Sequence, residues 1–577
     1  MKKLIAFVMA LCLLSAPSVI QSVQEIPVVS HAEEITSENL TFIEYDDHVI
    51  VSKCEFRAEG EIVIPSEVNG KPVTSIEGFG SCYWITSVII PDTVTSINYG
   101  AFRKCTSLEN ISIPESVTSI GEKAFEESLW LELQQQENPL VIVNDIVVDG
   151  TACEGEVIIP DGMRIINNYA FYKNEAVTSV IIPDSVTDIN TRAFQGCINL
   201  ENISVPDSVT SFQAQAFGET SWLENQKSEN PLVIINDILI DGTACEGEVT
   251  IPDNVHTIGE FAFYMCETIS SVVIPDTVTS IGMTAFYHCV NLESITLPEN
   301  IDCIPSSMFV FCKNLKSVHI PESVTKIGSN AFSDCLSLTE IIIPEQVTEI
   351  GSGAFSGCTS LTEITVPDSV TEIGSFAFQQ CVNMTSVHLG TGLTAIESDV
   401  FATAGLTEIT IPENVQSIGQ MAFRGCHKLT SVVIPANVNK ISGWAFFDCA
   451  DLQSVTIENP DCKIANDAYT FFNGDNPESS DGLFSGIVYG YADSTAQTYA
   501  ENCGYHFEPI AESTELKGDV NADGVFNVSD VVMLQKWLLS VPDTHLTNWK
   551  TADFTNDGKL DVFDLILMKK TLLEENK

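Results

Sequence analysis

The amino-acid sequence repeats itself with a period of 23 residues. A phenylalanine marks the phase of the repeat, at Phe102, Phe125, Phe171, Phe194, Phe217, Phe263, Phe286, Phe309, Phe332, Phe355 and Phe378. Proline keeps the same spacing at the ends of short β-rich segments. A unit of this size cannot bury its own apolar face, so neighbouring units have to stack and share a continuous core. The period therefore predicts a repeat solenoid.

One repeat shows how each coil is expected to fold. Val272 and Ile274 alternate with a third apolar residue before Pro275. Alternation directs these side chains inward, and proline ends the strand because it has no N–H for the ladder. Gly282 is expected to permit a tight bend, and Phe286 is expected on a short helical or 3-10 turn. Each coil should thus add one strand to a parallel sheet.

The charge of the chain excludes one class of partner. Its 26 Lys and Arg residues face 79 Asp and Glu residues, which gives a formal net charge of -53. A protein that binds nucleic acid has to neutralise phosphates with positive charge. No nucleic-acid partner is expected.

The first residues are typical of a secretory signal. Two lysines precede an apolar run over residues 4–14, and the small residues Ser30 and Ala32 follow later. These are the charged, apolar and cleavage regions of a signal peptide, and the apolar run is too short to span a bilayer. We predict a signal peptide over residues 1–32, a secreted, extracellular protein and no membrane span.

Cysteine keeps the phase of the repeat. It recurs three residues after the phenylalanine, at Cys105, Cys197, Cys266, Cys289, Cys312, Cys335, Cys358, Cys381, Cys426 and Cys449. Export would allow a ladder of disulfides, and zinc is a weaker alternative because no CxxC pair occurs. A residue type fixed in phase with the core is more simply a small buried side chain, so we predict buried thiols.

Two units are longer than the rest, residues 126–160 and 218–252. They nearly match each other at an offset of 92 residues, which is four periods, so a block of four units was duplicated. Asn144-Asp145 and Asn236-Asp237 stand between apolar runs and predict β-hairpins. The tryptophan in each long unit is expected to pack locally.

The repeat elements are a strand ending in Ile-Pro, then Val-Thr-x-Ile-Gly, then Ala-Phe-x-x-Cys. Over residues 63–458 they resemble the BspA-like leucine-rich-repeat family. The resemblance implies a solenoid of parallel β strands with short helical or 3-10 turns. It also implies a surface used for recognition, and it brings no catalytic residue.

The solenoid needs covering at both ends. Residues 33–62 are expected to form an N-terminal cap. Residues 459–507 are expected to form the C-terminal cap, with a strand, a helix that begins at Ser494 and stops at Gly504, and a second strand. Residues 508–516 form a short polar linker.

Two stretches near the C-terminus have the spacing of calcium loops. Such loops place oxygen ligands at positions 1, 3, 5, 9 and 12, a glycine at position 6 and a backbone carbonyl at position 7. The first loop supplies Asp519, Asn521, Asp523, the carbonyl of Val525, Asn527 and Asp530. The second, 34 residues later, supplies Asp553, Thr555, Asp557, the carbonyl of Lys559, Asp561 and Asp564. We predict two Ca²⁺ ions, the second bound more weakly because Thr555 replaces Asn or Asp.

Each calcium loop lacks an entering helix and is followed by an amphipathic one. The inward positions are predicted to be Val531, Leu534 and Leu538 in the first helix, and Leu565, Met568 and Leu572 in the second. Residues 517–577 thereby resemble a type I dockerin, a small all-α calcium-binding domain. The resemblance implies docking onto a cohesin module of a scaffoldin, as in cellulosomes.

The same resemblance implies which residues contact cohesin. The family's contact positions correspond to Val528, Ser529, Gln535 and Lys536 in the first copy, and to Val562, Phe563, Lys569 and Lys570 in the second. The two sets differ, so we expect an asymmetric module with one preferred binding mode.

The outward face of the repeat strands is the candidate surface for a second ligand. Its middle column carries no Trp or Tyr, which favours a protein or peptide over crystalline polysaccharide. The polar candidates on this face are His319, His388, Glu340, Glu363 and Glu408.

We predict a secreted, noncatalytic recognition protein attached through its dockerin to a cellulosome or cell surface. The repeats leave no segment of about 100–200 residues for a separate catalytic fold. HExxH, GxSxG and phosphate-loop motifs are missing as well. One alternative is a cellulosomal accessory protein in polysaccharide degradation, through carbohydrate binding or an unrecognised glycoside hydrolase activity. Another is a protease inhibitor or adhesin with the same architecture.

Overall fold

The computed structural model describes residues 33–37, 39–475, 483–510, 516–539, 541, 544, 546–547, 549–555 and 558–575. The chain forms two compact units. The first takes the chain up to Ile301 together with Ser307–Pro321, and the second takes Asp302–Ser306 with the chain from Glu322 onward. The predicted signal peptide, residues 1–32, lies outside the described residues.

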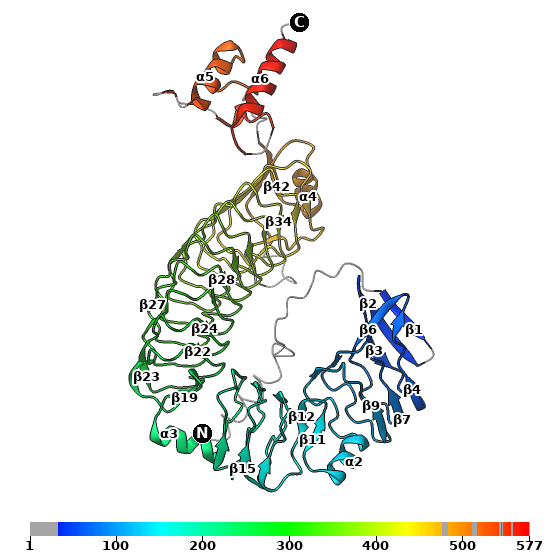
Figure 1. Ribbon diagram of the computed structural model, residues 1–577. Coiled ribbons are helices and arrows are strands. Elements are labelled where there is room, and N and C mark those ends of the chain that lie inside the picture. Colours follow the sequence, from blue (N-terminus) through cyan, green and yellow to red (C-terminus); the bar gives the residue numbers. More distant parts are fainter. Residues whose placement is uncertain are drawn as a thin grey trace. The chain divides into compact units, whose positions relative to one another are not determined.

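The first unit begins with an antiparallel meander of β1 (Glu33–Ser37), β2 (Leu40–Glu44) and β3 (Val49–Cys54). Strand β3 then pairs in parallel with β6 (Lys71–Ile76), and the short β5 (Glu67–Val68) pairs antiparallel with β6 (Figure 1). The pairing changes from antiparallel to parallel where the repeats begin.

Each complete coil can contribute two strands, and equivalent strands pair in parallel. The longer strands of the first unit are β4 (Glu59–Val63), β7 (Trp84–Ile89), β9 (Asn110–Ser112), β13 (Gly155–Ile158), β15 (Val177–Ile181), β17 (Asn202–Ser204), β21 (Gly247–Thr250), β23 (Ile269–Val273), β25 (Ser294–Thr296) and β27 (Ser317–Val318). The two-residue strands are β8 (Ser96–Ile97), β10 (Ser119–Ile120), β14 (Ile165–Ile166), β16 (Asp188–Ile189), β18 (Ser211–Phe212), β22 (Thr257–Ile258) and β24 (Ser280–Ile281). Val272 lies opposite Ile295, 23 residues later, so the ladder keeps the register of the repeat.

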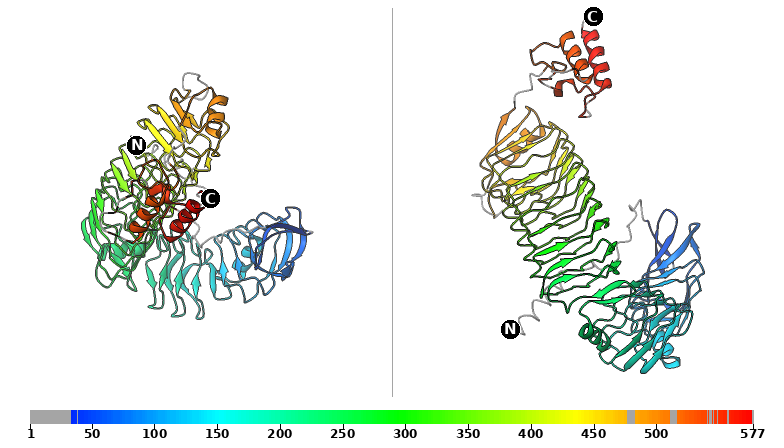
Figure 2. Two further views of the ribbon diagram at one scale, coloured as in Figure 1. Left: turned by 90° about the horizontal axis from the view of Figure 1, so that it is seen from above. Right: turned by 60° about the vertical axis from the view of Figure 1, so that its left-hand side comes forward.

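The second unit continues both kinds of ladder. Its short strands lie side by side at regular spacing in the right-hand view of Figure 2. They are β26 (Cys303–Ile304), β28 (Lys326–Ile327), β29 (Glu349–Ile350), β31 (Glu372–Ile373), β33 (Ala395–Ile396), β34 (Ser417–Ile418), β36 (Lys440–Ile441) and β39 (Lys463–Ile464). The other ladders are formed by β30 (Glu363–Thr365), β32 (Ser386–His388), β35 (Ser431–Ile434), β37 (Phe446–Phe447), β38 (Ser454–Ile457) and β40 (Phe471–Phe472). The predicted parallel β-solenoid is confirmed.

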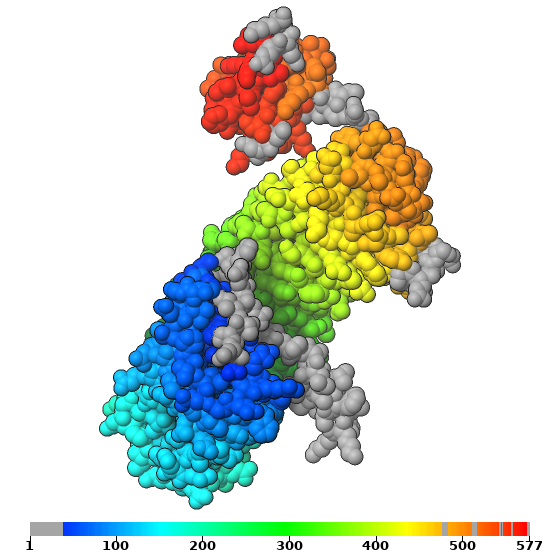
Figure 3. Space-filling model, turned by 90° about the vertical axis from the view of Figure 1, so that its right-hand side faces the viewer, coloured from blue at the N-terminus to red at the C-terminus, as the bar shows by residue number. Residues whose placement is uncertain are grey.

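The repeat phenylalanines form a stacked column. Phe355 lies 5.3 Å from Phe332 and 5.5 Å from Phe378 between ring centroids, with planes inclined by 2° in both pairs. The Phe332 N–H donates to the Ala354 carbonyl of the next coil at 2.8 Å. Each coil is therefore tied to the next by backbone hydrogen bonds and by buried rings. In the space-filling view the sequence colours pass in bands from green to orange along the repeats of the second unit (Figure 3).

The segment that carries the phenylalanine differs from the predicted helical or 3-10 turn. Around Phe332 the chain makes consecutive tight turns. Asn330 and Asp334 adopt left-handed backbone angles, with φ of 55° and 57°. A right-handed helix cannot include such residues, so these turns stop short of one.

Gly282 is needed for a reason other than the predicted bend. A Cβ atom at this position would lie 2.4 Å from the Glu260 backbone nitrogen. The preceding coil therefore approaches too closely for a side chain at Gly282.

The cysteines are buried thiols, as predicted, and they take part in a second ladder. Cys358 Sγ donates to the Phe332 carbonyl at 3.1 Å, and the same carbonyl accepts the Cys335 N–H at 3.2 Å. A carbonyl oxygen has two lone pairs, so the thiol occupies the second one. The same contact is made by Cys105, Cys197, Cys289, Cys312, Cys381, Cys426 and Cys449. The cysteines of the described residues are free.

Both long units contain the predicted hairpin. Asn144-Asp145 connects β11 (Val141–Val143) to β12 (Ile146–Asp149), and Asn236-Asp237 connects β19 (Val233–Ile235) to β20 (Ile238–Asp241). The Asn144 amide donates to the carbonyls of Pro114 and Val117, at 2.9 Å each. This contact fixes the hairpin on the preceding coil.

A short helix precedes each hairpin and was not predicted. The helices are α2 (Leu129–Glu137), capped by the Ser128 hydroxyl, and α3 (Ser221–Glu229), capped by the Thr220 hydroxyl. Trp130 in α2 packs 4.5 Å from Phe125, and Trp222 in α3 packs 4.8 Å from Phe217. The tryptophans therefore pack locally, as predicted.

After the last repeat the chain forms β41 (Ile487–Gly490), α4 (Thr495–Cys503) and β42 (His506–Pro509). The Ser494 hydroxyl caps the start of α4, and Gly504 ends it with φ of 72°. The predicted order of strand, helix and strand, with both helix limits, is confirmed. None of the helices in the described part of the chain combines the length and apolar character needed to cross a membrane.

Candidate functional site

The first predicted calcium loop is closed by two buried carboxylates. Asp519 is 5% exposed, and its Oδ2 accepts the Gly524 N–H at 2.6 Å. Asp530 is fully buried, and its two oxygens accept the N–H groups of Val520 at 3.1 Å and Asn527 at 2.9 Å. The first and last predicted ligands of the loop are thus both held by the loop's own backbone.

Local sequence explains this geometry. Gly524 has φ of 84°, and a Cβ atom there would meet open space, so only the backbone angle favours glycine. Asn527 caps helix α5 (Val528–Leu538), and Asp530 completes a capping box with it. The last loop ligand therefore also starts the exit helix.

The second loop repeats the arrangement. Asp553 Oδ2 accepts the Gly558 N–H at 2.8 Å. Asp564, fully buried, accepts the N–H groups of Thr555 and Asp561 at 2.9 Å each. The predicted ligand Asp557 lies outside the described residues.

The hydrogen bonds to the Asp564 carboxyl also change its pKa. Burial opposes its ionisation, but the N–H groups of Asp561 and Thr555 and the Thr555 hydroxyl stabilise the charged form. The net effect lowers the pKa of Asp564 below its ordinary value. An ionised carboxylate is the form that binds a metal cation.

The exit helices pack on a small core of their own. It contains residues from α5, from the 3-10 helix η2 (Trp549–Ala552) and from α6 (Val562–Glu575). The buried members are Val520, Phe526, Val531, Leu534, Ala552, Leu565 and Met568, with Leu538 and Leu572 partly buried against them. The predicted inward faces of both helices are confirmed.

The chemistry of the loops fits Ca²⁺, which takes oxygen ligands from carboxylates, amides and backbone carbonyls. Asp519, Asn521, Asp523, Asn527 and Asp530 supply such oxygens in the first loop. Among the described residues, no group of three or more His, Cys, Asp or Glu side chains is gathered as a metal site. The loop carboxylates instead accept backbone N–H groups.

The predicted cohesin-contact residues lie on the surface of α5 and α6. Val528 and Phe563 are each 64% exposed and Val562 is 55% exposed. Ser529, Gln535, Lys536, Lys569 and Lys570 are exposed too. Lys569 Nζ donates to Gln535 Oε1 at 3.2 Å, which brings the two predicted sets into contact.

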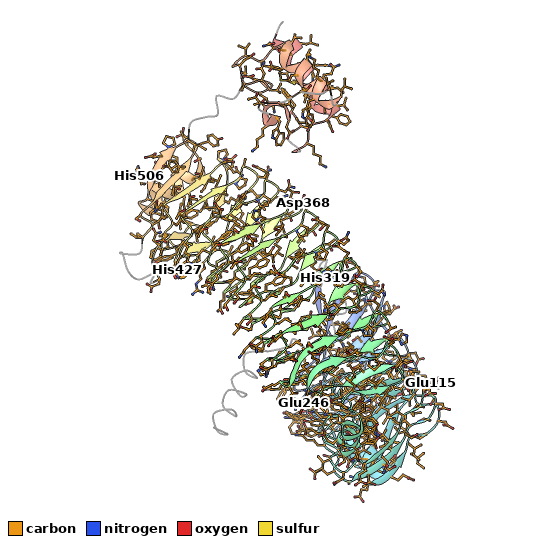
Figure 4. All side chains as sticks on the ribbon, turned by 90° about the vertical axis from the view of Figure 1, so that its left-hand side faces the viewer. Glu115, Glu246, His319, Asp368, His427 and His506 are labelled. Carbon is orange, nitrogen blue, oxygen red and sulfur yellow. The ribbon has the colours of Figure 1, made fainter. Side chains whose placement is uncertain are left out.

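The predicted polar candidates are also exposed, but of the five only Glu363 in β30 and His388 in β32 lie in strands. The His319 side chain, labelled in Figure 4, is 73% exposed and lies 3.9 Å from Glu299. His388, Glu340, Glu363 and Glu408 are exposed in the second unit. Exposed apolar residues occupy the equivalent repeat position in each unit, at Ile89, Ile158, Ile181 and Val273 in the first and at Ile342 and Val433 in the second. The exposed repeat positions therefore offer both polar and apolar side chains. Among the described residues, the predicted candidates do not form a catalytic cluster.

One feature that the sequence did not predict is a cavity of about 220 Å³ beside α3 and the hairpin of the second long unit. Its lining includes Gln195, Gln215, Glu260, Phe261 and Tyr264. The sequence contained one indication of a difference at this place: several lining residues differ from the residues 92 positions earlier, in the first copy of the duplicated block.

Comparison with known proteins gives two family matches. The model described as BspA type leucine rich repeat region (6 copies) matches residues 74–144, 151–246, 241–362 and 348–475, which together exceed half of the chain. The dockerin type I domain model matches residues 517–573. None of the curated proteins matches the chain.

Several solved structures are similar to the chain. A leucine-rich repeat protein from Bacteroides ovatus is 24% identical, with 83% of this chain and 100% of that chain covered and a TM-score of 0.42. A leucine rich cell surface protein from Faecalibacterium prausnitzii is 27% identical, with 62% and 95% covered and a TM-score of 0.29. A leucine rich repeat protein from T. pallidum is 32% identical, with 32% and 77% covered and a TM-score of 0.25.

Proposed function

The chain belongs to the BspA-type leucine-rich-repeat family and carries a type I dockerin domain, and from that premise we propose that it is a secreted, noncatalytic recognition protein. Its repeats bind a protein or surface ligand, and its dockerin attaches the chain to a cohesin module of a scaffoldin. This proposal divides the chain into a signal peptide (1–32), an N-terminal cap (33–62), repeats (63–458), a C-terminal cap (459–507), a linker (508–516) and the dockerin (517–577).

The observation that carries the proposal is the repeated loop and helix at the C-terminus. The two loops use the same backbone contacts at positions 34 residues apart, from Asp519 to Gly524 and from Asp553 to Gly558. Each loop leads into a helix with one face in the core and apolar residues left exposed. Exposed apolar groups on a rigid helix suit docking to a complementary surface.

Calcium has a structural part in this proposal. Type I dockerins are calcium-binding modules. Here Asp519, Asn521, Asp523, the carbonyl of Val525, Asn527 and Asp530 would hold one ion, and Asp553, Thr555, Asp557, the carbonyl of Lys559, Asp561 and Asp564 a second. Bound metal offsets the repulsion among the clustered carboxylates and so favours the folded loops.

The outward face of the repeat strands is proposed as the surface for the second ligand. Exposed Ile342 and Val433 supply apolar contact area, and Glu340, Glu363 and Glu408 are exposed as well. With a net charge of -53, the chain attracts basic partners over a long range. A protein ligand with a basic, partly apolar surface fits this face.

The experiment uses the full chain captured on an immobilised type I cohesin in the presence of calcium. The captured chain is then probed with an array of proteins and an array of plant cell-wall glycans. We expect protein ligands to bind and glycans to remain unbound. Selective binding of cellulose or xylan would contradict the protein-ligand proposal, and release or turnover of glycan would contradict the noncatalytic one.

A further inference from the structure

A cavity lies beside the second long unit. It measures about 220 Å³ and is lined by residues of three successive coils and of α3, among them Gln195, Gln215, Glu260, Phe261 and Tyr264. This volume holds several water molecules, whose share of the liquid is about 30 Å³ each. The cavity is therefore large enough for part of a ligand side chain.

Lys227 is the lysine among the described lining residues, and it is already neutralised. Lys227 Nζ lies 3.2 Å from Asp241 and 3.1 Å from Glu224, and both the lysine and Asp241 side chains are largely buried. Glu260 differs, because no ion-pair partner is found for it among the described residues. Its carboxylate accepts an N–H from Ala214, and burial raises the pKa of Glu260 above its ordinary value. An additional cation would stabilise this carboxylate.

Gln195, which also lines the cavity, carries an unpaired acceptor. Its Oε1 is buried and has no hydrogen-bond partner among the described residues. The orientation of this amide is set by its nitrogen, which donates to Gln215 Oε1 at 3.3 Å and to Glu219 at 3.4 Å. Among the described residues no donor reaches this oxygen, and an unpaired buried acceptor is costly.

The duplicated block shows what fills this position in the first long unit. Tyr169, the counterpart of Phe261, has the ammonium of Lys123 at 5.1 Å and the guanidinium of Arg192 at 5.8 Å from its ring centroid. The residues 92 positions after these two cations are Gln215 and Thr284. The second block has thus lost both cations beside its aromatic ring.

The second block has also gained an anion. Asn168 of the first block corresponds to Glu260. Two further exchanges partly offset this change. Glu122, which pairs with Lys123 at 2.7 Å, is replaced by Ala214, and Gln135 is replaced by Lys227, so the five exchanges together shift the local charge by one unit in the negative direction. The fold is otherwise retained, with the same helix, hairpin and stacked phenylalanines.

We propose that this cavity binds the side chain of a lysine from a protein or peptide ligand. An ammonium has three donors and no acceptor, which matches the Glu260 carboxylate. The methylene stem would lie against Phe261 and Tyr264, as the stem of Lys123 accompanies its ammonium onto Tyr169. The inference deepens the proposed recognition function by naming a ligand group, and it does not depend on the dockerin.

The test measures binding of Nα-acetyl-lysine methylamide to the full chain by saturation-transfer NMR, with Nα-acetyl-norleucine methylamide as the probe that lacks the ammonium. Two variants address the cavity. Glu260→Gln removes the carboxylate charge at constant size, and Gln215→Lys restores the cation of the first block. Glu248→Gln, at an exposed site on β21, is the matched control for the loss of one negative charge.

We expect the lysine probe to bind at least tenfold more tightly than the norleucine probe. Binding should fall at least tenfold in Glu260→Gln and Gln215→Lys and stay unchanged in Glu248→Gln. Equal affinity for the two probes, or full binding by Gln215→Lys, would overturn the proposal. Circular dichroism checks that each variant is folded. If Gln215→Lys does not fold, the binding measured for Glu260→Gln alone tests the proposal. Cohesin capture of the same preparations separates failure of this site from failure of the docking function.

Discussion

Lys569 donates a hydrogen bond to Gln535 at 3.2 Å, and the two residues occupy the same position in copies of a unit that repeats after 34 residues. Equivalent residues can touch only where the two copies approach each other face to face. Helices α5 and α6 therefore meet at this pair, and both predicted cohesin-contact sets adjoin it. A symmetric module would carry the same residue on both sides, whereas here an amide meets an ammonium.

The first prediction is unequal use of the two contact sets. Phe563 is 64% exposed and aromatic, while its counterpart Ser529 is small and polar. Burying an aromatic side chain contributes about 1.5–3 kcal/mol, far more than a serine can. Phe563→Ala should thus weaken cohesin binding by at least tenfold, and Ser529→Ala by less than threefold, in titration calorimetry. Equal losses in the two variants would contradict the expected single binding mode.

The second prediction concerns removal of calcium. Saturation with a ligand at about one hundred times its Kd stabilises a fold by about 2.7 kcal/mol. Chelation should therefore lower the melting temperature of the dockerin and reduce the helical circular dichroism of α5 and α6. The repeats, whose ladders do not involve these loops, should melt as before. An unchanged helical signal after chelation would show that the metal has no structural part.

The sequence was sufficient to predict the solenoid, its register and the inward residues of the two dockerin helices. The reason is that apolar period and strand pairing depend on the same 23-residue spacing, as the pairing of Val272 with Ile295 shows. The hairpin turns at Asn144 and Asn236 were predictable as well, because asparagine tolerates the left-handed backbone that they adopt.

Other features depend on distances that a single sequence does not contain. The role of Gly282 follows from how closely the preceding coil approaches, and the thiol ladder follows from where the Phe carbonyls point. Helices α2 and α3 are nine residues each, too short for their periodicity to stand out. The cavity at Glu260 is lined by residues of separate coils, so the duplication could show which residues had changed but not that they surround a cavity.

The third prediction tests the thiol ladder. Cys358→Ala removes the donor that bonds the Phe332 carbonyl and leaves a small void in the core. The lost hydrogen bond and the void should together lower the free energy of unfolding by about 1–3 kcal/mol, measured by urea denaturation. Cys303→Ala, at a partly exposed cysteine outside the ladder, is the control and should change it by less. An equal loss of stability in both variants would contradict a stabilising role for the thiol hydrogen bonds.

The fourth prediction is loss of stability at alkaline pH. Burial raises the pKa of the Cys197, Cys381 and Cys426 thiols to about 12, from an ordinary value of 9.0. Above pH 9 the unfolded chain releases these protons while the folded chain retains them. The stabilisation is therefore complete below pH 9 and is lost as the pH rises toward 12. Urea midpoints from pH 8 to 11 should fall steadily, and a flat profile would contradict buried thiols.

Titration of thiols in denaturant provides an independent check of the same point. The repeat cysteines should all react once the chain is unfolded, and slowly or not at all in the folded protein. A low count in denaturant would indicate disulfides in place of the thiol ladder.

The most direct test of the whole account is calorimetric titration of the full chain with a type I cohesin, with and without a calcium chelator. We predict one-to-one binding in calcium that disappears on chelation, and that is lost in the double variant Asp519→Ala, Asp553→Ala while the repeats remain folded. Binding that persists without calcium, or no binding to any of a broad panel of type I cohesins, would contradict the proposal that this solenoid is carried to a scaffold by its C-terminal domain.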